Sequence, residues 1–199
     1  MHKQSESIVE VVKHVVVHSI IGIGTGEVFN VVVDAMSGAV TNLINDTEKM
    51  GVPLIETLSG VIESAIEGVA EVGGGLDEAA KGIVVGILRA GKEAGAGTVD
   101  VLGTISVIVI QKTAEMAGDT GAAAQGLVMG AVEGAEELGL NGEEAASKAA
   151  VGAVKAAYEI SVEAGDKVLD AVTETICGMR RLFLKSYSNP GRKNKRFIF

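Results

Sequence analysis

The sequence predicts an all-α fold built from 22-residue repeats, each containing two 11-residue units. Three observations lead to this prediction: an apolar column that recurs every 11 residues, matching segments at offsets of 22 and 44 residues, and glycines spaced by 22. Eleven residues fit three helical turns at about 3.67 residues per turn, so positions 11 apart stay on one helix face. We therefore expect an antiparallel helix array, which is a solenoid or a bundle.

The repeat is visible when segments are compared directly. Residues 80–95 and 124–139 match at an offset of 44, and residues 60–73 fall into the same register. Duplication of one 22-residue unit would produce such an uninterrupted register. The 11-residue column is apolar throughout: Val17, Val28, Ala39, Met50, Val61, Val72, Ile83, Ala94, Ile105, Met116, Leu127, Leu138, Ala149, Ile160, Ala171 and Leu182.

Small residues form a second face beside this apolar column. One column holds Gly86, Gly97, Gly130 and Gly152, and a neighbouring one holds mostly alanine. Because glycine allows backbones to approach closely, we interpret these four glycines as self-association contacts and expect a homo-oligomer. The remaining arc carries carboxylates and lysines. We interpret it as a solvated stripe or as salt-bridging positions for Lys81, Lys92, Lys112, Lys148 and Lys155.

A further column marks where helices are expected to end. It contains glycine at positions 51, 73, 95 and 139, together with Ala117 and Ser161. Glycine is common just after a helix, where the chain turns through a left-handed residue. We therefore predict about seven helices of roughly 17 to 19 residues, joined by short turns. The alternative is one continuous helix of roughly 165 residues in a right-handed hendecad coiled coil.

Charge divides the chain into three parts. We expect a lead-in helix over 1–15, a helical repeat domain over 16–178 and a basic tail over 179–199. The tail holds seven Lys and Arg residues and no acid, so residues 1–178 carry −16 against −9 for the whole chain. Basic and apolar residues together suit a protein groove or an anionic membrane. The predicted contact residues are Arg180, Arg181, Phe183, Lys185, Arg192, Lys193, Lys195, Arg196, Phe197 and Phe199.

Composition favours a cytoplasmic location, with attachment to a membrane surface as the alternative. The mean hydropathy is high at +0.36, yet no uncharged stretch reaches the roughly 20 residues that a spanning helix needs. The N-terminal segment lacks the basic region and apolar core of a signal peptide. The single cysteine, Cys177, agrees with a reducing compartment. The acidic body is not expected to bind nucleic acid.

No constellation of residues suggests catalysis, so we expect neither an enzyme nor a cofactor. Residues 22–26 are rich in glycine, but Glu27 stands where a dinucleotide loop needs glycine. Residues 86–92 match the start of a phosphate-binding loop, but Glu93 replaces its Ser or Thr. Glu10, His14 and His18 share a helix face and form a weak candidate metal site. A partly exposed polar face is the simpler interpretation.

The sequence therefore favours a structural scaffold that associates with itself and docks a partner through its basic tail. The 11- and 22-residue periods also resemble those of exchangeable apolipoproteins and synuclein across most of the chain. This resemblance implies reversible binding to lipid surfaces, although the body is acidic where those proteins carry many lysines. A further alternative is an oligomer, lined by valine and isoleucine, that encloses a lipophilic molecule.

Overall fold

The protein is described here by a computed structural model covering residues 2–50, 54–93 and 99–188. Every regular element in these ranges is helical, which confirms the predicted all-α class. There are eight α-helices in the described ranges instead of the seven expected. The elements are α1 (His2–Ile23), η1 (Thr25–Glu27), α2 (Val28–Met50), α3 (Leu54–Glu71), α4 (Leu76–Glu93), η2 (Val99–Val101), α5 (Leu102–Glu115), α6 (Thr120–Glu137), α7 (Gly142–Ile160) and α8 (Val162–Ser188).

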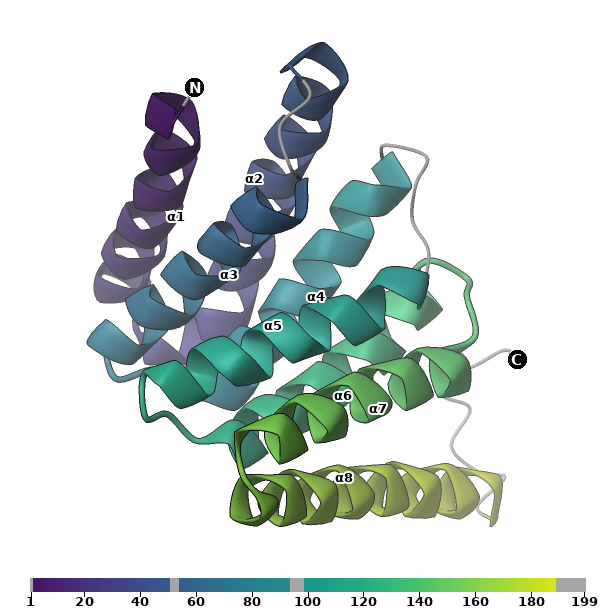
Figure 1. Ribbon diagram of the computed structural model, residues 1–199. Coiled ribbons are helices and arrows are strands. Elements are labelled where there is room, and N and C mark those ends of the chain that lie inside the picture. Colours follow the sequence, from purple (N-terminus) through teal and green to yellow (C-terminus); the bar gives the residue numbers. More distant parts are fainter. Residues whose placement is uncertain (1, 51–53, 94–98, 189–199) are drawn as a thin grey trace.

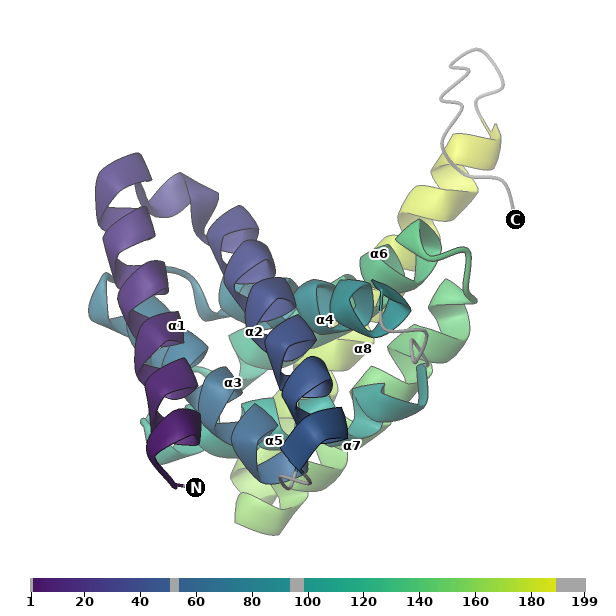
Figure 2. The ribbon, with the colours of Figure 1, turned by 90° about the horizontal axis from the view of Figure 1, so that it is seen from above.

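The helices form two layers. Helices α2, α4, α6 and α8 lie side by side in one layer, and α1, α3, α5 and α7 lie side by side in the other. Consecutive helices run in opposite directions, and the helix axes rotate from α1 toward α8 (Figures 1 and 2). Each helix therefore packs mainly against the helices two positions away in the chain and against its sequence neighbours in the other layer. The alternative of one continuous helix does not describe this chain.

Several helix ends coincide with the predicted column of breaks. Helix α3 is followed by Gly73 at φ 71°, and α6 is followed by Gly139 at φ 72°. Helix α5 is followed by Ala117, which is left-handed at φ 54° although it is not glycine. Helix α7 ends at the extended residue Ser161. Positions 51 and 95 of this column lie outside the described residues.

The first helix boundary lies outside this column, and two helices run across the positions expected as domain limits. Helix α1 ends at Ile23 and is followed by Gly24 (φ 108°), five residues before the break column would pass through Phe29. The same helix runs continuously through residue 15, the expected end of the lead-in. Helix α8 likewise continues past residue 179, so part of the expected tail extends the last helix.

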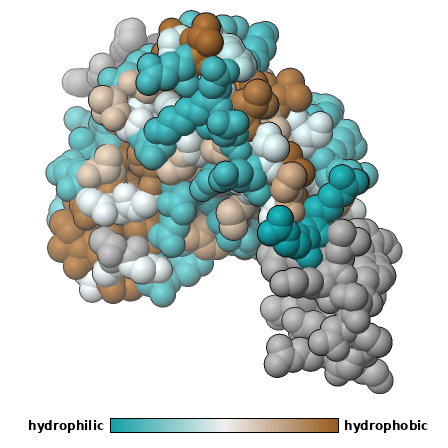
Figure 3. Space-filling model, turned by 90° about the horizontal axis from the view of Figure 1, so that it is seen from below, coloured by the Kyte–Doolittle hydropathy of each residue, from teal (hydrophilic) through white to brown (hydrophobic). Residues whose placement is uncertain are grey.

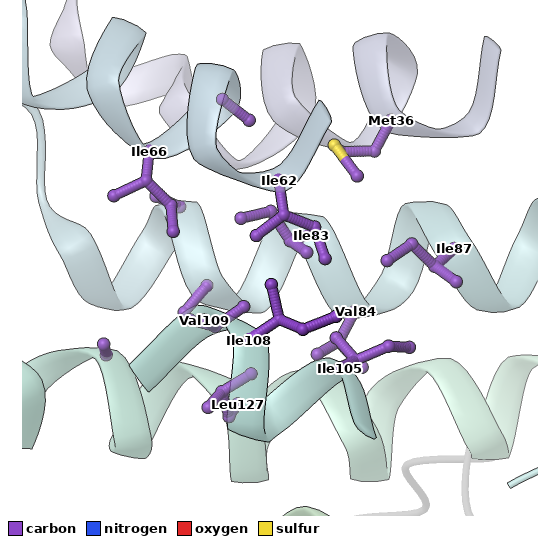
Figure 4. Packing of buried hydrophobic residues seen from close by; sticks show 14 of the residues in the cluster. Met36, Ile62, Ile66, Ile83, Val84, Ile87, Ile105, Ile108, Val109 and Leu127 are labelled. Carbon is purple, nitrogen blue, oxygen red and sulfur yellow. The ribbon is translucent and has the colours of Figure 1, made fainter. Parts of the chain in front are cut away.

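The core fills the space between the two layers. Side chains of Ile62 and Ile66 on α3, Ile83 on α4, Ile105 on α5 and Leu127 on α6 are essentially fully buried there, and they point toward one another (Figure 4). The 11-residue apolar column is buried or half-buried wherever its side chains are described, except at Ile160. No helix in the described ranges is long and apolar enough to cross a membrane.

Candidate interaction surfaces

The glycines predicted to join separate copies lie at contacts between helices of one chain. A Cβ atom on Gly86 of α4 would lie 2.7 Å from the Cβ atom of Met36 on α2. A Cβ atom on Gly130 of α6 would lie 2.7 Å from the carbonyl oxygen of Lys81 on α4. Gly152 of α7 meets the backbone of Gly103 on α5 even more closely. These three surfaces are therefore occupied inside a single molecule, and Gly97 lies outside the described residues.

Ion pairs follow the same arrangement, because they join helices that are neighbours within a layer. The Arg89 guanidinium on α4 donates two hydrogen bonds, each 2.9 Å, to the Glu137 carboxylate on α6. That carboxylate raises the pKa of Arg89. Further pairs within a layer join Lys13 to Glu67, Lys81 to Glu133, Lys112 to Glu63, Lys148 to Asp100 and Lys167 to Asp119. The repeated carboxylates thus include many structural contacts.

Large apolar side chains remain exposed mainly at the two ends of the array. Among the side chains that the structure describes, those strongly exposed belong to α1, α7 or α8, with three exceptions: Val101, Met129 and Leu140. Seen from the side of α8, apolar groups lie among hydrophilic ones at the surface (Figure 3). The end side chains, with their exposed fractions, are Val11 (56%), Val15 (41%), Ile21 (70%), Ile23 (66%), Val151 (65%), Tyr158 (42%), Ile160 (45%), Val162 (70%), Leu169 (43%) and Ile176 (37%).

The sequence alone does not single out these end residues. They belong to the same valine- and isoleucine-rich pattern that fills the core of the inner helices. What distinguishes them is position, because in the described part of the chain the first and last helices have no neighbouring helix on one side. The order of helices in the chain is thus the signal that could have identified them.

A groove lies between α1 and α2 at the N-terminal end of the array. Its apolar surface comes from Val15 and Ile23 on α1 and from Val31 and Ala35 on α2, and its polar lining includes Glu27 and Asp34. The Asn30 amide donates a 2.7 Å hydrogen bond to Glu27. Within the described part of the chain, neither Glu27 nor Asp34 forms an ion pair. The groove therefore combines an apolar floor with two carboxylates that form no ion pair in the described part of the chain.

The basic segment begins on the outer part of α8. Arg180 and Arg181 are exposed there, beyond Val172, the last buried side chain that the structure describes on this helix. Phe183 and Lys185 belong to the same helix, but their side chains are not described. The other predicted contact residues, Arg192, Lys193, Lys195, Arg196, Phe197 and Phe199, lie outside the described residues. The C-terminal end of helix α8 lies away from α1 in both ribbon views (Figures 1 and 2).

The weaker sequence motifs lie in helical surroundings. The His14 and His18 rings are 4.0 Å apart on α1, but the described residues include no group of three His, Cys, Asp or Glu side chains arranged to hold a metal ion. Gly86 and Lys92 both lie inside α4, and Gly86 is buried against α2. Residues 22–26 span the end of α1 and the start of η1.

Comparison with known proteins identifies no relative of this chain. No family model, no curated protein and no solved structure matches the chain. The functional argument therefore depends on the surfaces described above.

Proposed function

We propose that this chain is a non-enzymatic helical-repeat scaffold that associates with further copies of itself through the apolar ends of its helix array. The exposed valines and isoleucines of α1, α7 and α8 carry this proposal. Helices inside the array bury the corresponding side chains against a neighbour in their layer. The end helices lack that neighbour, and another copy would supply it.

The repeat is supported by equivalent contacts 44 residues apart. Gly82 and Gly86 on α4 lie against α2, and Gly126 and Gly130 on α6 lie against α4. Both helices have 18 residues and begin 44 positions apart, at Leu76 and Thr120. Because each hairpin offers its successor the same kind of surface, a further copy could extend the array by the same geometry.

The energetic argument is based on apolar area. Val151 and Val162 are 65% and 70% exposed, and full burial of a side chain of this size contributes about 1.5 kcal/mol or more. Several such side chains at each end supply a driving force of the size that weak to moderate association needs. A contact between unlike ends is heterologous, so it produces rings when it closes and filaments when it does not.

Light scattering of the purified chain across a concentration series tests the proposal. We expect an average mass that rises above the 20.3 kDa of one chain. Replacing Val151 and Val162 together with serine should weaken association roughly tenfold or more, because about 2 kcal/mol of burial is lost. The matched control is Met129→Ser, which removes an exposed apolar side chain on α6 and should leave association unchanged. A compact monomer at all concentrations would refute self-association.

Circular dichroism with and without vesicles distinguishes the scaffold proposal from reversible lipid binding. In the scaffold proposal, circular dichroism shows full helix content without vesicles, and vesicles leave it unchanged. Helix content that rises only when vesicles are added would instead support the reversible lipid-surface function.

A further inference from the structure

We infer that the basic C-terminal segment, residues 180–199, of one copy binds the groove between α1 and α2 of a second copy. This inference rests on the proposed self-association and specifies one of its contacts. The groove lies at one end of the array, and the segment begins on α8 at the other end. Their pairing would therefore join copies head to tail.

The groove has the chemistry that a basic and apolar segment requires. Val15, Ile23 and Val31 provide an apolar floor, and Glu27 and Asp34 stand beside it. The nearby cation is already engaged, because Arg89 binds Glu137 through two hydrogen bonds and influences Asp34 only through its charge. An incoming arginine or lysine would thus find carboxylates that the described residues leave without a cationic partner.

The segment is complementary to this groove in both charge and apolar content. Five of its seven cations lie beside apolar residues in the two runs Arg180-Arg181-Leu182-Phe183-Leu184-Lys185 and Lys195-Arg196-Phe197-Ile198-Phe199. The chain up to residue 178 carries −16, so another copy of this protein is an acidic partner. Cations that approach an acidic groove are steered by the field of the whole surface.

The direction of α8 favours a second copy over the groove of the same molecule. Helix α8 packs against α6 and α7, and its C-terminal end lies away from α1 in both ribbon views (Figures 1 and 2). An anionic membrane is a weaker candidate, because binding there would bring the acidic body close to a surface of the same charge. A protein groove with two carboxylates has no such penalty.

Two full-length variants separate these possibilities. The groove variant carries Glu27→Lys and Asp34→Lys, and the segment variant carries Arg180→Glu, Arg181→Glu and Lys185→Glu. Each lysine in the groove changes the charge by two, so the groove variant carries −5 instead of −9. Lower net charge reduces general repulsion between copies. A loss of association in this variant is therefore specific to the groove.

The expected results are measured by sedimentation at low and high salt. The groove variant and the segment variant should each associate at least tenfold more weakly than the wild type, and the difference should shrink at high salt because the charges are screened. An equimolar mixture should associate more tightly than either variant alone, since the intact segment of one fits the intact groove of the other. Matched controls with the same change in charge are Glu93→Lys and Glu136→Lys, exposed positions on the inner helices α4 and α6. These controls should not weaken association.

Other outcomes overturn the inference. If the wild type associates and the groove variant associates equally well, the segment does not bind this groove, although self-association stands. If the wild type is a monomer, the proposed function fails as well. If the equimolar mixture associates no more tightly than either variant alone, the segment does not bind the groove of a second copy, and docking within one molecule is indicated instead. Binding to anionic vesicles that depends on the segment and not on the groove would show a membrane partner. Circular dichroism of each variant confirms that it is folded.

Discussion

The backbone of α6 at Gly126 touches the backbone of α4 at Asp77, and a Cβ atom on Gly126 would overlap with the Asp77 carbonyl oxygen. Gly126→Ala should therefore force the two helices apart. We expect a loss of about 2 kcal/mol in the free energy of unfolding, which is the usual cost of overpacking. This loss should exceed the gain of about 1 kcal/mol that alanine brings in a helix interior. Urea unfolding followed by circular dichroism measures the difference.

Gly38 on α2 provides the control for this substitution. It also lies inside a helix, but apart from its chain neighbours and its own helix backbone no described atom lies within 4 Å of the position that its Cβ would occupy. Gly38→Ala should stabilise the protein by about 0.5 to 1 kcal/mol through helix propensity alone. Equal effects of the two substitutions would contradict the close contact between α4 and α6.

Ala117, which follows α5, should be improved by glycine. Its φ of 54° lies in the left-handed region, which costs an L-residue with a side chain roughly 1 kcal/mol or more. Ala117→Gly should raise the free energy of unfolding by about 0.5 to 1 kcal/mol. The reverse exchange at the equivalent break, Gly139→Ala, should lower it by a similar amount. Thermal unfolding of the two variants checks both signs, and a loss of stability in Ala117→Gly would argue against a left-handed turn there.

Asp119 should make stability dependent on pH in the acid range. Its carboxylate caps α6 by accepting from the Ala122 and Gly121 amides, and it pairs with Lys167. The Ala122 amide is the main cause of a pKa below the ordinary value of 3.8, and Lys167 adds to it. The lowered pKa means that the contribution is complete above about pH 3.8 and is lost as the pH falls through the folded value.

Asp119→Asn isolates that charge because the amide oxygen can still cap the helix. Both partners of the ion pair are more than half exposed, so we expect a cost below about 1 kcal/mol at neutral pH. The difference from the wild type should shrink as the pH falls below about 3.8 and the carboxylate becomes protonated. Urea unfolding at several pH values measures this. A difference that stays constant with pH would assign the effect to geometry instead of charge.

The Thr113 hydroxyl on α5 is fully buried and has no hydrogen-bond partner among the residues that the structure describes. An unsatisfied buried hydroxyl costs about 1 kcal/mol or more, whereas valine has nearly the same shape without the polar atom. Thr113→Val should therefore stabilise the protein by about 1 kcal/mol in chemical denaturation. Thr104→Val is a suitable control, since Thr104 is exposed on the same helix and should change stability by less than about 0.5 kcal/mol. A destabilised Thr113→Val variant would reveal a polar partner for the hydroxyl.

The sequence predicted helices and many of their ends because these depend on local residues. Gly73 and Gly139 end helices as expected, since a left-handed turn favours glycine at the position itself. The same reasoning missed the boundary at Gly24, because residues 22–26 fall outside the break column. It also gave one helix too few, since the boundary between α1 and α2 does not keep the 22-residue spacing.

The sequence pattern could not predict which helix packs against each helix face. The small-residue column correctly identified positions of close approach, including Gly130 and Gly152. It did not say that the approaching helix lies about 49 residues away in the same chain, because periodicity places residues on a face without naming the neighbour. The exposed ends and the groove at Glu27 depend on that choice of neighbour, so they became visible only in the folded chain.

The contact between Gly126 and Asp77 has a consequence for the chain as it leaves the ribosome. The face of α4 that includes Asp77 and Lys81 is covered by α6 only after residues 126 to 130 have been synthesised. The exposed face of each helix is thus buried only after about two further helices have been synthesised. During translation, the uncovered apolar surface of the nascent protein therefore lies on its most recently synthesised hairpin. A ribosome paused between α4 and α6 would expose an incomplete core that a chaperone could bind.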